Sequence, residues 1–270
     1  MSLVTLAILV LMGCVGGFLA GLLGVGGGMI LVPVLVMLFD REGYGAGSVM
    51  QMALATALAT IMFTSLSSMR AHHRTGAVQW PLVWRLVPGI LLGGQLGSRL
   101  VVWLPGRQLA LVFALFVGWM ATKMVRGARQ VPRDSQVSLP GSVGLAIVGA
   151  GIGVLSALFG AGGAFVTVPY LSGHGVPMQR AIGTSAACGF PIALSGTLGY
   201  LVMGWWQGGA GGALTYLNLH ALFTIVPMSM LFAPLGARMA HRLPVAHLKR
   251  AFGCLMYGLA GYMFVRSIRG

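Results

Sequence analysis

Apolar stretches about 20 residues long recur along the whole chain, and a helix of that length crosses the roughly 30 Å hydrocarbon core of a bilayer. Only 7% of the 270 residues are charged, whereas soluble domains carry roughly a quarter. The 3 acids are Asp40, Glu42 and Asp134, too few to give a globular surface its usual charge. Strictly alternating strands are not seen. These features predict an all-α integral membrane protein with several crossings.

The net charge of +14 raises the question of a nucleic-acid partner. However, the 17 Lys and Arg are spread over the loops between apolar segments. We interpret most of them as anchors that hold the span ends and set the topology, so no nucleic-acid partner is expected. Part of the excess charge could attract an anionic substrate. The 3 cysteines lie singly in apolar segments, so neither a metal site nor a cofactor is predicted.

Several short motifs occur twice, in the same order. Residues 24–33 (GVGGGMILVP) recur 136 residues later (24 to 160) as residues 160–169 (GAGGAFVTVP). The sequence LGSR at 96–99 recurs as LGAR at 235–238, at an offset of 139 (96 to 235). One glycine pair alone would mean little, but an ordered series of this kind predicts two homologous halves.

The halves are expected at residues 1–128 and 138–270, joined by a basic linker at 129–137 within one membrane domain. Each half begins with a long apolar segment, 2–39 or 140–172, that a glycine cluster and a proline break in the middle. Three ordinary transmembrane helices follow in each half, at about 47–70, 80–103 and 107–126, then 179–203, 213–237 and 246–266.

Lipid tolerates a broken helix only where the break is buried in protein or lines a cavity. A paired break at matching positions of two halves is typical of a transporter's binding site. If each broken segment crosses the membrane once, the halves are parallel. If each turns back as a hairpin, the halves are inverted, and most loop Lys and Arg then share one side. The positive-inside rule therefore favours inverted repeats, with both termini outside the cytoplasm.

The glycine clusters have a specific physical use. Without a Cβ, the backbone can turn tightly and present several N–H groups to an anion. Each cluster lies between two helical stretches, so a helix N-terminus there would add partial positive charge. The alternative is close helix packing through glycine. The predicted substrate-binding glycines are Gly24, Gly26, Gly27, Gly28, Gly160, Gly162 and Gly163.

One face of the helix expected at 47–70 carries a row of hydroxyl groups, at Thr56, Thr60, Thr64 and Ser67. Thr184 and Ser195 repeat the spacing of Thr56 and Ser67 in the second half. Small hydroxyl residues often join membrane helices, and that is the alternative to a binding role. We expect Thr56, Thr60 and Thr184 to contact the substrate.

The glycine motifs at 24–33 and 160–169 resemble those of the sulfite exporter TauE/SafE family, also called the toluene-sulfonate uptake permease group. Ala55-Thr56 and Gly183-Thr184-Ser185 look like its Ala/Gly-Thr-Ser motifs, and the resemblance covers nearly the whole chain. The sequence departs from the family at Ala57, where Ser is usual. The resemblance implies secondary transport of small sulfur-containing anions, such as sulfite and sulfonates including sulfoacetate. It also implies no catalysis, and adds Ser185 to the substrate-binding residues.

Acids are absent from the expected spans except at their edges, so a carboxylate proton relay is not available. Proton coupling would then need a histidine or the substrate itself. We propose His220, which lies within an expected span, as a possible proton-coupling residue. His72 lies beside other basic residues at a span end and is expected in a solvated loop.

Arg99 and Arg238 end the equivalent spans of the two halves. In inverted repeats they lie at opposite faces of the membrane, where each would attract anions to one mouth or hold one gate closed. The alternative is that both are interfacial anchors.

We therefore expect a multi-pass protein of the bacterial cytoplasmic (inner) membrane that moves a small anionic substrate across the lipid bilayer by alternating access. An anion channel or a structural subunit is the first alternative. The second is an intramembrane enzyme that uses Ser195 with His220.

Overall fold

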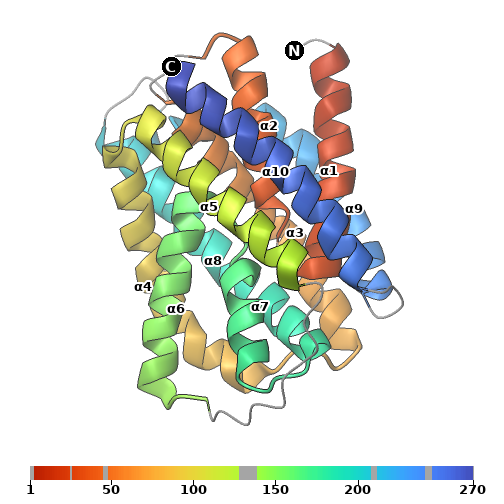
Figure 1. Cartoon of the computed structure of the whole chain (residues 1–270). Coiled ribbons are helices and arrows are strands. Elements are labelled where there is room, and N and C mark those ends of the chain that lie inside the picture. Colours follow the sequence, from red (N-terminus) through yellow and green to blue (C-terminus); the bar gives the residue numbers. More distant parts are fainter. Residues whose placement is uncertain are drawn as a thin grey trace.

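A computed structural model of the chain gives an all-helical bundle (Figure 1). It describes residues 3–24, 26–44, 48–127, 139–207, 212–240 and 245–269. The expected linker at 129–137 lies outside these residues.

The helices are α1 (Leu3–Leu23), α2 (Gly28–Arg41), α3 (Val49–Arg74), α4 (Trp80–Trp103), α5 (Gly106–Gly127), α6 (Ser142–Phe159), α7 (Ala164–Gly173), α8 (Met178–Trp206), the short 3-10 helix η1 (Gly212–Leu214), α9 (Leu219–Met239) and α10 (Val245–Arg269). Within the described residues, α1, α3, α4, α6, α8 and α9 are each long and apolar enough to cross a membrane. The prediction of a multi-pass helical membrane protein is confirmed.

Each broken first segment is a pair of helices, α1 with α2 and α6 with α7. Gly27 precedes α2 with φ 75° and ψ −10°, and Gly163 precedes α7 with φ 77° and ψ −16°, both in the left-handed region that favours glycine. The prolines do not contribute to the breaks, contrary to the sequence-based prediction. Pro33 lies inside α2 and Pro169 inside α7. The breaks lie at the glycine clusters that precede α2 and α7.

The two ends of the chain lie at the same end of the bundle, at the top of Figure 1. The pair α1–α2 opens toward that end, whereas α6–α7 opens toward the opposite end. The first helix of each pair packs against a helix from the other half, since α1 lies on α9 and α6 lies on α4. Helices α3 and α8 also pack together, as do α5 and α10. The halves interlock into one body.

Glycine allows the backbones to touch where α1 crosses α9. A Cβ added to Gly17 would overlap the Ser229 carbonyl oxygen, and one added to Gly21 would overlap that of Ala233. The crossing of α6 with α4 is built in the same way, through Gly149. Small residues allow this close approach in membrane bundles, where dispersion contacts and hydrogen bonds hold helices together.

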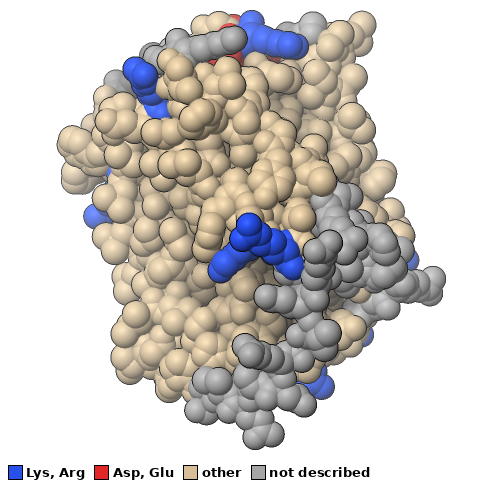
Figure 2. All heavy atoms as spheres, in the orientation of Figure 1, with Lys and Arg blue, Asp and Glu red and all other residues tan. Residues whose placement is uncertain are grey.

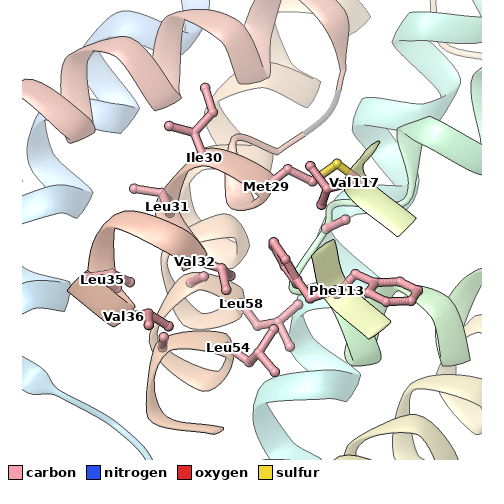
Figure 3. Close-up of a cluster of buried hydrophobic side chains, with 14 of the residues drawn as sticks. Met29, Ile30, Leu31, Val32, Leu35, Val36, Leu54, Leu58, Phe113 and Val117 are labelled. Atoms are coloured by element: carbon pink, nitrogen blue, oxygen red, sulfur yellow. The ribbon is translucent and has the colours of Figure 1, made fainter. Parts of the chain in front are cut away.

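The short helix α2 lies inside the bundle. Its side chains Met29 and Val32 are fully buried. Figure 3 shows them in a cluster with Leu58 of α3 and Phe113 of α5. The break between α1 and α2 is therefore buried in protein, as a non-helical segment at this depth requires.

Uncharged side chains cover most of the face shown in Figure 2. The acidic atoms visible there lie at the end of the bundle that carries the chain termini. At that end Asp40 of α2 accepts two hydrogen bonds from Arg266 of α10, at 2.6 and 2.9 Å. This ion pair fixes the end of α2 to the end of α10.

Candidate functional site

The two glycine clusters, predicted separately from the two halves, meet inside the bundle. A Cβ added to Gly26 would lie 3.0 Å from the Cα of Gly162, and one added to Gly28 would overlap the Gly160 carbonyl oxygen. The side chain of Ile61 on α3 lies against both Gly26 and Gly28. Positive φ angles occur at Gly24 (68°), Gly26 (74°), Gly27 (75°), Gly160 (58°) and Gly163 (77°).

Two helix N-termini begin at this meeting point. Helix α2 starts after Gly27 and α7 after Gly163, and no side chain in the described part of the chain caps either start. The first N–H groups of an α-helix have no acceptor within the helix, and the N-terminus carries partial positive charge. The arrangement can therefore hold an anion by backbone groups, without a buried cationic side chain.

Thr56 and Thr184 occupy equivalent places in two helix contacts. The Asn218 N–H, at the start of α9, donates to Thr56 Oγ1 at 3.0 Å. The Gln79 N–H, at the start of α4, donates to Thr184 Oγ1 at 3.0 Å. Each threonine thus caps the start of a helix from the other half. These contacts fit the alternative prediction, in which small hydroxyl residues join membrane helices.

The rest of the hydroxyl row on α3 also makes helix contacts. Thr60 Oγ1 donates to the Thr56 carbonyl at 2.9 Å, one turn earlier in the same helix. Thr64 Oγ1 shares a 2.7 Å hydrogen bond with Ser229 of α9. Ser67 Oγ donates to the Met230 carbonyl of α9, also at 2.7 Å. Of these three hydroxyls, those of Thr64 and Ser67 therefore bind α9.

Ser185 differs from the other predicted hydroxyls. It is fully buried, and its Oγ has no hydrogen-bond partner among the described residues. The same holds for Thr167 on α7 and Ser68 on α3. Buried hydroxyls without partners are uncommon in folded proteins, and a ligand or water can satisfy them. Thr167 was not among the residues predicted from the sequence, although it follows Gly163, the last residue of the second glycine cluster, by four residues.

His72 is in the core, and the prediction of a solvated loop position is wrong. Its side chain is 1% exposed, and Nε2 lies 2.8 Å from the Gly21 carbonyl oxygen of α1. The reason is that α3 extends to Arg74, beyond the expected end near residue 70, so His72 faces the glycine surface of α1. Tyr200 makes the matching contact in the second half, donating to the Ala157 carbonyl of α6 at 3.2 Å.

His220 lies in the first turn of α9, where it is exposed and lines a cavity at the end of the bundle. Ser195, its partner in the enzyme alternative, donates instead to the Leu91 carbonyl at 2.6 Å. The structure therefore gives Ser195 a helix contact, with its hydroxyl proton directed at a backbone carbonyl.

Arg99 and Arg238 are both exposed, near the C-terminal ends of α4 and α9. These ends lie at opposite ends of the bundle (Figure 1). Neither arginine forms an ion pair with the described acids. Neither is among the residues nearest to Gly26 or Gly28, so any action on an anion there would be through space.

A multi-helix bundle in which two discontinuous helices meet in the interior has the architecture of a membrane transporter. The chain belongs to the sulfite exporter TauE/SafE family, whose profile matches residues 9–263.

Individual relatives match over most of the chain. A probable membrane transporter protein of Haemophilus influenzae is 35% identical over 95% of this chain and 97% of its own. Bacillus subtilis YdhB, also described as a probable membrane transporter protein, is 25% identical over 87% of this chain and 90% of its own. An archaeal protein of that description, from Methanocaldococcus jannaschii, is 26% identical over 74% of this chain and 73% of its own. No solved structure matches the chain. The family and these relatives are membrane transporters rather than enzymes.

Proposed function

We propose that this protein is a secondary transporter that moves small sulfur-containing anions across the bacterial cytoplasmic (inner) membrane by alternating access. Sulfite and sulfonates such as sulfoacetate are the expected substrates. The observation that carries the proposal is the meeting of two glycine breaks and two uncapped helix N-termini in the interior. Discontinuous helices whose N-termini point at an anionic group form the substrate sites of many transporters.

Alternating access would follow from two inverted repeats, 1–128 and 138–270, joined by the linker at 129–137. Equivalent hydrogen bonds support this division. Ser67 donates to Met230, and Ser195 donates to Leu91, so the donors are related by an offset of 128 (67 to 195) and the acceptors by 139 (91 to 230). The opposite directions of the α1–α2 and α6–α7 pairs also favour inversion over parallel repeats (Figure 1).

The backbone at Gly26 and Gly162 would hold the anion, together with the neighbouring glycines of each cluster. We propose that the hydroxyls near the two breaks assist, with Ser185 the first candidate because its buried Oγ lacks a hydrogen-bond partner in the described part of the chain. Arg99 and Arg238 would attract anions at the two mouths. His220, at one mouth, is a possible carrier of a coupling proton.

Uptake into proteoliposomes tests this proposal. Purified protein would be reconstituted and given radiolabelled sulfite, sulfoacetate or sulfate, with and without an imposed proton gradient. Saturable uptake of sulfite or sulfoacetate above that of empty liposomes is expected. Uptake of none of the three anions under either condition would contradict the assignment of substrate.

A further inference from the structure

A cavity of about 640 Å³ opens at the end of the bundle that carries the chain termini. We call it the vestibule. Its volume lies in the range of about 300–1,000 Å³ typical of small-molecule sites. It is formed by the start of α1, the end of α2 with the residues after it, and the start of α9. The polar side chains that line it are Thr5, Arg41, Glu42, Tyr44, Asn218 and His220.

The vestibule presents charges of both signs. Arg41 and Glu42 are consecutive at the end of α2, and both line the cavity. The neighbouring Asp40 is engaged by Arg266. Among the described residues, Arg41 and Glu42 form no ion pair within 4.0 Å. One cation and one anion therefore face the same cavity without neutralising each other in a direct contact.

The N-terminal end of α9 adds partial positive charge to the vestibule. Asn218 caps this helix by accepting the Ala221 N–H on Oδ1, at 3.0 Å. Its N-terminus brings partial positive charge to the same cavity wall as His220. An anionic group is thus favoured near Arg41 and the start of α9, whereas Glu42 repels it and attracts a cation.

We propose that the vestibule is a selectivity site for small organic zwitterions that carry a sulfonate and an ammonium group. The sulfonate group follows from the proposed function, on which this inference depends. The ammonium group follows from the Glu42 carboxylate, with which it would pair. An inorganic oxyanion occupies only a few water volumes, of roughly 30 Å³ each, and would leave most of the cavity empty. It would also leave the Glu42 carboxylate without a counter-charge.

Hydrogen bonds connect this site with the interior. Asn218 is 9% exposed, and its Nδ2 donates to the Tyr44 hydroxyl in the vestibule wall at 3.2 Å. Its backbone N–H donates to Thr56 Oγ1 inside the bundle. A ligand that takes over the Tyr44 hydroxyl would therefore remove one hydrogen bond from Asn218, the residue whose N–H joins the start of α9 to Thr56 of α3.

The adjacent charges of Arg41 and Glu42 belong to the first half of the chain, at the end of α2. Helix α2 ends at Arg41 with Glu42 as its C-cap residue, whereas the equivalent helix α7 ends at Gly173 with His174 as its C-cap residue. The end of α7 therefore carries no counterpart of this charged pair among the described residues. Selection for a zwitterion would operate at the end with the chain termini and not at the opposite end.

Calorimetric titration of the purified full-length protein tests the proposal. Two ligands of matched size are compared, 2-aminoethanesulfonate and 2-hydroxyethanesulfonate, which differ in the ammonium group. The wild type should bind the amino compound about ten-fold or more tightly, because an ion pair or charge-assisted hydrogen bond is lost with the hydroxyl. Glu42→Gln should bring the two affinities within two-fold, whereas Arg41→Gln should weaken both by about ten-fold. Arg74→Gln, an exposed change at the far end of α3, is the control and should alter neither.

Equal wild-type affinities for the two ligands would overturn the proposal, as would a Glu42→Gln variant that keeps the wild-type preference. Sulfite uptake by the same preparations tests the proposed function independently of the titration. Transport of sulfite without discrimination in the titration refutes the vestibule alone. Discrimination that depends on Glu42, with no transport of any sulfur-containing anion, supports the vestibule and refutes the proposed function.

Discussion

Replacing Gly26 with alanine tests whether the contact between the glycine clusters is essential. Gly26 has a φ of +74°, and a Cβ there would lie 2.9 Å from Ile61 Cγ2 and 3.0 Å from Gly162 Cα. The left-handed conformation alone costs an alanine about 1–2 kcal/mol. Forcing a methyl group against a packed backbone adds about 1–3 kcal/mol. We expect Gly26→Ala to lower the free energy of unfolding by roughly 2–5 kcal/mol and to reduce transport strongly.

Gly43→Ala is the matched control. Gly43 has nearly the same φ, +78°, but a Cβ there would meet nothing within 4 Å. This variant therefore carries the conformational cost without the contact. The difference between the two variants isolates the contact and should be about 1–3 kcal/mol.

Thermal unfolding in detergent and sulfite uptake in proteoliposomes measure the two effects. At about 2–4 °C per kcal/mol for a chain of this size, Gly26→Ala should melt several degrees below Gly43→Ala. Gly43→Ala should transport at the wild-type rate. Equal melting temperatures and equal uptake in the two variants would show that the close approach of Gly26 to Gly162 has no importance for stability or transport.

Three further predictions concern Thr56 with Thr184, His72, and Arg99. Thr56→Val and Thr184→Val each leave a backbone N–H without its acceptor and should destabilise by about 1–3 kcal/mol; if the threonines also bind substrate, affinity should fall roughly ten- to hundred-fold, as titration would show. His72→Ala should lower the free energy of unfolding by about 2–5 kcal/mol, as thermal unfolding would show. His72→Tyr should lower it much less, because Tyr200 makes the matching contact in the other half. Equal losses in the two variants would contradict that equivalence. Arg99→Gln should slow uptake mainly below about 0.1 M salt, where charges act over 10 Å or more, and unchanged rates at low salt would make it an anchor.

The sequence predicted the helices and the two breaks correctly because those features depend on local composition. Apolar length determines a span, and glycine determines where a helix can end. The matching positions of Gly26 and Gly162 in two distant motifs also indicated that the two breaks are equivalent. Proline was misleading for a local reason, since Pro33 lies in the first half of α2 and does not end it.

Burial at the helix ends could not be predicted in the same way. His72 lies three residues from an exposed helix end at Thr75, and only the approach of Gly21 from another helix makes it a core residue. The role of Thr56 likewise depends on Asn218, 162 residues away in the chain. Hydroxyl spacing indicates a shared helix face, but the partner on that face is decided by tertiary packing.

Counterflow tests the central claim most directly, because only a carrier that alternates between two faces can show it. Proteoliposomes would be loaded with unlabelled sulfite and diluted into a trace of radiolabelled sulfite, with Gly26→Ala and Gly43→Ala run beside the wild type. We predict that label inside the wild-type liposomes rises transiently above its external concentration, that Gly43→Ala behaves alike, and that Gly26→Ala shows little or no overshoot. Entry of label that never exceeds the external concentration would identify a channel and contradict alternating access at the glycine site.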